Sequence, residues 1–184
     1  MTNERDHRMV WAGQLADKID KHLDGPYIYP HLHARLALLL HGEEIRFVQL
    51  EADQVRGFSI SGDLRVWTDR QLAVTRFDHL VCLAPGVPPD DYEDHSAAQV
   101  SVQLIPRNAL TAMGLPSSSS DGAAINGGNQ WMSGLRDSDW SWPRGAALVL
   151  TYDGLEQPIV LPGTGDPAEL EALIPSLLID LAAR

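Results

Sequence analysis

The chain has 184 residues and a formal net charge of −11, with 25 acidic residues against 14 basic ones. This length favours one domain, and the acidic balance argues against nucleic acid, anionic membranes and phosphoinositides as partners. No apolar run approaches the roughly 20 residues of a membrane span, and a charged N-terminus with one cysteine in the chain favours a reducing, cytoplasmic location.

The first segment of the chain predicts an amphipathic helix. Four apolar residues recur at every fourth position and form one stripe: Trp11, Leu15, Ile19 and Leu23. The Gly25-Pro26 pair that follows is a helix stop signal. We therefore expect residues 1–25 to form an N-terminal helix packed on the domain, and residues 26–184 to form a single β domain.

Strand patterns dominate the middle of the chain. Runs with strand character lie at 34–42, 43–52, 55–67, 71–77, 99–105 and 145–163. Glycine-containing turn signals predict hairpins at Ser61-Gly62-Asp63 and at Asp153-Gly154. Pro158 predicts an edge strand after the second turn. The run 99–105 alternates apolar and polar residues, which predicts one buried and one wet face.

The end of the chain predicts a second amphipathic helix. Asp166 is suited to the N-cap, Pro167 to the first helical position and Glu169 to a capping box. Leucines and an isoleucine then recur at helical spacing. Pro175 interrupts this pattern, so we expect either a kink or two short helices.

Three features together resemble the bacterial pleckstrin-homology-like (PH-like) domains over about residues 44–183. They are the turn Thr68-Asp69-Arg70 between two apolar runs, the Ile105-Pro106 stretch before the next strand, and the closing helix. The resemblance implies an α+β fold, an antiparallel PH-like barrel or strongly bent sheet with an N-terminal helix and a C-terminal amphipathic helix. It also implies a binding or assembly scaffold without catalytic residues. The family plan lacks the 114–144 insertion.

The insertion at 114–144 is a long loop rich in serine and glycine, yet it contains three of the five tryptophans. Loops of this length are usually functional or disordered. Trp131, Trp140 and Trp142 suit either of two roles. They contact a protein partner or a second copy of the chain, or they fold back and cover the domain's own barrel.

Polar residues at two places suggest chemistry, and each has a structural alternative. His31 and His33, if on a strand, point to one face as metal ligands do, although no third ligand stands at a recognisable spacing. Asp69 and Arg70 either grip a ligand or shape a turn, the aspartate by bonding nearby backbone N–H groups. A small-ligand protein or enzyme that uses these four residues, with a pocket between the sheet and the 114–144 loop, is the alternative function.

Other motifs are incomplete. Ser59 lacks the second glycine of a nucleophile elbow, and the glycines of 125–131 lack a phosphate-binding pattern. Five arginines of the first sheet are matched by five acidic residues, so no basic lipid-binding surface is expected. The sequence predicts a non-enzymatic cytoplasmic interaction or assembly module, and it assigns no catalytic residue, cofactor or metal.

Overall fold

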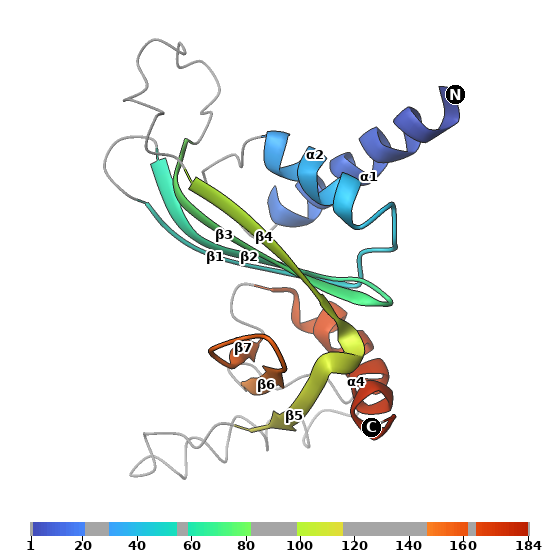
Figure 1. Cartoon of the computed structure of the whole chain (residues 1–184), viewed down its shortest axis with the longest axis vertical. Helices are drawn as coiled ribbons and strands as arrows, with labels where there is room; N and C mark the ends of the chain where they lie inside the picture. The colour runs from blue at the N-terminus through green and yellow to red at the C-terminus, as the bar shows by residue number, and fades with distance from the viewer. Residues whose placement is uncertain are drawn as a thin grey trace. The chain divides into compact units, whose positions relative to one another are not determined.

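The computed structural model describes residues 2–20, 30–54, 59–81, 99–115, 147–161 and 165–183 (Figure 1). The chain divides into two compact units, Met1–Pro106 and Arg107–Arg184. The first unit contains α1 (Thr2–Asp20), α2 (Pro30–Leu39), β1 (Phe47–Gln54), β2 (Ser59–Trp67), β3 (Gln71–Val81) and β4 (Gln99–Pro106). The second contains the 3₁₀ turn η3 (Arg107–Ala109), β5 (Leu110–Gly114), β6 (Leu148–Tyr152), β7 (Ile159–Leu161) and α4 (Pro167–Ala182).

The first unit is a four-stranded antiparallel sheet in the order β1-β2-β3-β4, with α1 and α2 on one face (Figure 1). The predicted stripe of α1 is confirmed where it is described, because Trp11, Leu15 and Ile19 are buried in the core between helices and sheet. Leu23 lies outside the described residues. The indole N–H of Trp11 also donates to the backbone carbonyl of Glu43, 2.6 Å away, which fixes α1 to the segment before β1.

The strand predicted over 34–42 is wrong, because residues 30–39 form the helix α2. Short apolar runs fit a buried strand and a buried helix equally well by pattern. Here Leu32, Leu36 and Leu40 recur every four residues and are buried, whereas Leu38 and Leu39 are exposed. Leucine and alanine favour helix over strand, which accounts for the outcome.

The hairpin turn predicted at Ser61-Gly62-Asp63 is also wrong. These residues lie inside β2, which pairs along its length with β1, and its pairing with β3 is irregular between Ile60 and Gly62. A Cβ at Gly62 would stand 2.0 Å from the carbonyl oxygen of Glu51. The glycine therefore marks a close approach of two backbones at an irregular strand pairing and not a chain reversal.

The predicted alternation of β4 is largely confirmed. Gln99 and Ser101 are exposed, whereas Val100 and Val102 are partly buried against the core. Leu104, expected on the buried face, is 36% exposed. The pattern of β4 thus weakens along the strand.

The second unit contains a three-stranded antiparallel sheet in the order β5-β6-β7. The predicted reversal at Asp153-Gly154 is confirmed, since it follows β6 and leads to the antiparallel strand β7. Gly154 has a φ of 92°, a value that favours glycine. Pro158 comes directly before β7, and β7 is an edge strand of the described sheet, as the proline predicts.

The helix α4 begins as the sequence predicts. The Asp166 carboxylate accepts a hydrogen bond of 2.8 Å from the backbone N–H of Ala168, and Pro167 occupies the first helical turn. Of the two outcomes expected at Pro175, a kink or two short helices, the second is wrong, because α4 continues through Pro175; the kink stays a prediction. Proline removes the donor to the Glu171 carbonyl, but Glu171 is exposed and water can replace that donor.

The architecture is α+β, with two antiparallel sheets and helices toward both chain ends. No strand pairing among the described residues closes the sheets into a barrel. The expected domain plan, a helix over 1–25 and one β domain over 26–184, stays a prediction.

Candidate functional site

The turn between β2 and β3 is the feature on which the sequence resemblance depends. The backbone N–H of Thr68 donates to the carbonyl of Gln71 over 2.9 Å, and the N–H of Gln71 donates to the Thr68 hydroxyl over 3.0 Å. That hydroxyl in turn donates to a carboxylate oxygen of Glu43, 2.5 Å away. Thr68 is fully buried, so its hydroxyl holds the reversal from inside.

Asp69 is part of the turn, and its side chain bonds an arginine from the segment before β1. Its two carboxylate oxygens accept from the Nε and Nη2 of Arg46 over 2.8 and 3.2 Å. Arg46 also bonds Glu44 over 2.8 Å. The hydrogen bond with Asp69 raises the pKa of Arg46 above its ordinary value, and both carboxylates add to that shift. The pair ties the segment before β1 to the turn, while Thr68 caps the backbone.

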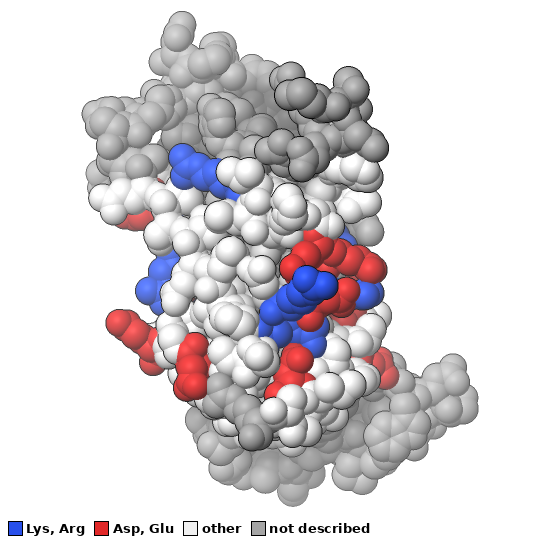
Figure 2. All heavy atoms as spheres, turned by 45° about the vertical axis from the view of Figure 1, so that its right-hand side comes forward, with Lys and Arg blue, Asp and Glu red and all other residues white. Residues whose placement is uncertain are grey.

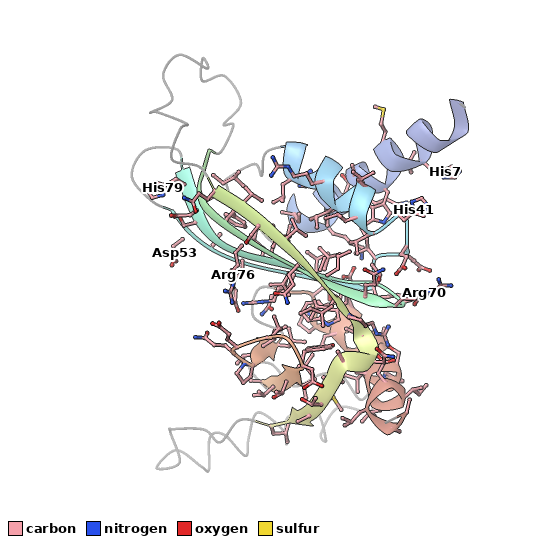
Figure 3. All side chains as sticks on the ribbon, in the orientation of Figure 1. His7, His41, Asp53, Arg70, Arg76 and His79 are labelled. Carbon is pink, nitrogen blue, oxygen red and sulfur yellow. The ribbon has the colours of Figure 1, made fainter. Side chains whose placement is uncertain are left out.

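Arg70 is exposed and projects outward from the turn (Figure 3). Its backbone N–H points to the Thr68 hydroxyl at 3.4 Å. Within the described part of the chain, its guanidinium forms no hydrogen bond or ion pair. Of the two turn residues singled out in the sequence, Asp69 has a structural partner and Arg70 is available to solvent.

The strand geometry that would have put His31 and His33 on one face is absent, because both belong to the helix α2. His33 is buried, and the side chain of His31 lies outside the described residues. No group of three or more His, Cys, Asp or Glu side chains that could hold a metal ion occurs among the residues that the structure describes. The hypothesis of a two-histidine ligand set thereby loses its geometric basis.

A network of charged side chains covers part of the sheet face that points away from the helices. Arg65 donates to Glu51 over 2.8 Å, to Asp63 over 2.7 Å and to the amide oxygen of Gln49 over 3.0 Å. Arg76 lies 3.7 Å from the second oxygen of Asp63. From the sequence, equal numbers of basic and acidic residues were expected here, but not which of them form pairs. Alternating polar residues in two neighbouring strands were the available signal.

A smaller cluster lies near the irregular pairing of β2 with β3. The Ser61 hydroxyl donates to Asp78 over 2.6 Å and accepts the backbone N–H of His79 over 3.0 Å. The His79 imidazole lies 2.9 Å from the same carboxylate oxygen. The Ser61 hydrogen bond is the main cause that holds the pKa of Asp78 below its ordinary value, and His79 contributes to that shift.

This cluster contains the residue types of a hydrolytic triad in the wrong order. A serine nucleophile needs the imidazole beside its hydroxyl to accept the proton. Here the carboxylate lies between Ser61 and His79, so both groups contact Asp78. The arrangement stabilises a local irregularity of the sheet and does not activate the serine.

Basic and acidic atoms lie directly beside one another on the face that Figure 2 presents, and no continuous basic area covers it. Asp53 and Arg76 likewise project from the sheet face opposite the helices (Figure 3). The described arginines Arg46, Arg65 and Arg107 each pair with at least one carboxylate. These three arginines are therefore compensated by carboxylates and do not favour recognition of phosphate.

The tryptophans on which the sequence hypothesis of partner contact rests, Trp131, Trp140 and Trp142, lie outside the described residues. Among the helices that the structure describes, none is long and apolar enough to cross a membrane. In comparisons with known proteins, the chain matched no protein-family model, no curated protein and no solved structure.

Proposed function

We propose that the chain is a non-enzymatic, cytoplasmic protein-interaction or assembly module built on a PH-like scaffold, a barrel or strongly bent sheet. The resemblance in sequence has counterparts in the element order. Thr68-Asp69-Arg70 connects β2 to β3, Ile105-Pro106 ends β4 before the next strand, and α4 follows the last strand. These matches support the scaffold, and they say nothing of the partner.

The observation that favours a module over an enzyme is the internal use of polar groups at the most suggestive position. Thr68 bonds Gln71 and Glu43, and Asp69 bonds Arg46. A catalytic side chain must instead reach the substrate, while other residues fix its position. At this turn the polar side chains bond other groups of the protein, so we infer a structural role for them.

The alternative, a small-ligand protein or enzyme that uses His31, His33, Asp69 and Arg70, receives less support. The helix α2 removes the shared face of the two histidines, and Asp69 is paired with Arg46. Arg70 is exposed, and among the described side chains of this set its charge is available to a ligand.

The contact residues of the proposed module are Trp131, Trp140 and Trp142. The test replaces Trp140 and Trp142 with alanine in the full chain, with a matched variant in which both become phenylalanine. Partners are compared by cross-linking and affinity capture, oligomeric mass by light scattering, and folding by thermal melting. We expect the alanine variant to lose its partner at an unchanged melting temperature, and the phenylalanine variant to keep it, because aromatic area supplies the contact.

Two results would contradict this contact role. An unchanged partner set and unchanged oligomeric mass in the alanine variant would show that the rings do not bind. A lower melting temperature with unchanged partners would show that the rings cover the domain itself.

A further inference from the structure

The two edges of the first sheet differ in charge. The edge strand β1 contains Glu51 and Asp53, both exposed. The opposite edge strand β4, with the sequence QVSVQLIP, contains no charged residue, in a chain whose net charge is −11. In the described sheet, each of these strands has a neighbour on one side only (Figure 1).

Exposed strand edges bind other strands unless charges, prolines or bulges protect them. The strand β1 is protected by its carboxylates, since a second β1 beside it would bring acidic side chains together. The strand β4 has no such protection between Gln99 and Ile105. Its pairing with β3 runs through eight consecutive residues without a register shift, and its proline, Pro106, stands at the very end.

We propose that β4 is a self-association edge, on which β4 of a second copy of this chain pairs antiparallel about a two-fold axis. With Val102 opposite Val102 of the second copy, Val100 stands opposite Leu104 on the helix side of the sheet. On the other side Ser101 stands opposite Gln103. Every cross-strand pair on the helix side is apolar, and no like charges meet.

We infer that the partner on this edge is a second copy of the chain, because in this register the strand is complementary to itself. Leu104 is 36% exposed although the strand pattern directs it to the apolar side, and pairing with Val100 of the second copy would cover it. The uncharged strand also keeps acidic residues out of the seam. One strand pair buries less than the area of a stable interface, so the dimer is weak and depends on concentration.

Net charge gives this dimer a characteristic salt dependence. Two copies with a net charge of −11 each repel at long range. Added salt screens that repulsion, so the dimer Kd should fall as NaCl rises. A foreign basic strand on the same edge would show the opposite salt dependence, because screening would remove an attraction.

The experiment measures the dimer Kd of the full chain by analytical ultracentrifugation. Ser101→Lys places a lysine on the edge, where the two copies bring their lysines into diagonal proximity, and should weaken the dimer about tenfold or more. Gln14→Lys, on an exposed position of α1, is the matched control. Both variants reduce the net negative charge equally, so long-range electrostatics alone predicts tighter association for each.

A mixing experiment tests the seam directly. Ser101→Glu should weaken the dimer as well, and an equal mixture of Ser101→Lys with Ser101→Glu should restore it, since opposite charges then lie diagonally across the seam. If the serine variants fail to fold, hydrogen exchange on the unmodified chain supplies the answer. The amides of β4 should become more protected as the protein concentration rises, while those of β1 should not.

The proposal is overturned if the unmodified chain stays monomeric at every concentration, or if Ser101→Lys dimerises as tightly as Gln14→Lys. Amide hydrogen exchange in β4 that does not depend on protein concentration would also overturn it. This inference extends the proposed assembly role to a different surface from the tryptophans. Trp140→Ala and Trp142→Ala should therefore leave the β4 dimer intact, and the two proposals can fail separately.

Discussion

One arginine–aspartate pair from each unit, Arg46–Asp69 and Arg107–Asp180, can be compared, and the two differ in burial. In the second unit, Arg107 of η3 donates through Nε and Nη2 to one oxygen of Asp180 on α4, over 2.8 and 2.6 Å. The exposed fractions of these side chains are 4% and 19%. In the first unit, the Arg46–Asp69 pair has a comparable distance of 2.8 Å, with exposed fractions of 42% and 54%.

The comparison separates the geometry of an ion pair from its contribution to stability. Water around an exposed pair weakens its attraction, and such pairs contribute about 0–1 kcal/mol. A buried arginine without its carboxylate leaves an uncompensated charge, which is costly. The Arg107–Asp180 pair therefore matters to the stability of its unit chiefly because removing the carboxylate would leave a buried positive charge that Asp180 no longer compensates. Arg46–Asp69 fixes local geometry at little gain in free energy.

The largest expected effect follows from removing the charge of Asp180. Asp180→Asn removes the carboxylate that the buried Arg107 guanidinium contacts and should lower the unfolding free energy of the second unit by about 2–4 kcal/mol. Hydrogen exchange of the α4 amides measures that free energy. Asp69→Asn is the matched control and should cost under about 1 kcal/mol in the first unit. Equal losses in the two variants would refute the assignment of the effect to burial.

A second, intermediate effect concerns the hydroxyl beneath the exposed pair. Thr68→Val keeps the shape of this buried side chain but removes the bonds to Gln71 and Glu43. It should cost about 1–3 kcal/mol, more than Asp69→Asn at the same turn. Chemical denaturation with exchange of β2 and β3 amides measures the loss. Thr68→Ser retains the hydroxyl and should recover most of it. If Thr68→Val is as stable as the unmodified chain, the hydroxyl does not hold the turn.

Features that depend on neighbours in sequence were predictable. The stripe of Trp11, Leu15 and Ile19, and the cap at Asp166, need only helical spacing and one local hydrogen bond. The turn at Thr68 was located as well, since threonine and aspartate are both common turn residues. Their side-chain partners elsewhere in the chain, Glu43 for Thr68 and Arg46 for Asp69, could not be predicted from spacing alone.

Features that depend on distant residues were not predictable. Gly62 was interpreted as part of a turn. A glycine is needed there because the carbonyl of Glu51 on β1 leaves no room for a Cβ, and the sequence does not show that contact. The run of α2 resembled a strand because a short apolar run fits both elements, and the burial of Leu32 and Leu36 on one helix face is seen only in the fold. The Arg65 network likewise needed the register of β1 with β2 before its members could be grouped.

The smallest expected effect concerns another exposed carboxylate, that of Asp78. Its lowered pKa means that the folded state binds its proton less tightly than the unfolded state does. The resulting stabilisation is present above the unfolded pKa, about 3.9 for aspartate, and is lost as the pH falls through the folded pKa. Ser61→Ala should raise the pKa of Asp78 toward its ordinary value, but only in part, because His79 remains beside the carboxylate. The stability difference between the two proteins should therefore shrink as the pH falls. Carboxyl NMR titration measures the shift, with Ser101→Ala as the control, and identical pKa values in all three proteins would show that the Ser61 hydroxyl does not stabilise this charge.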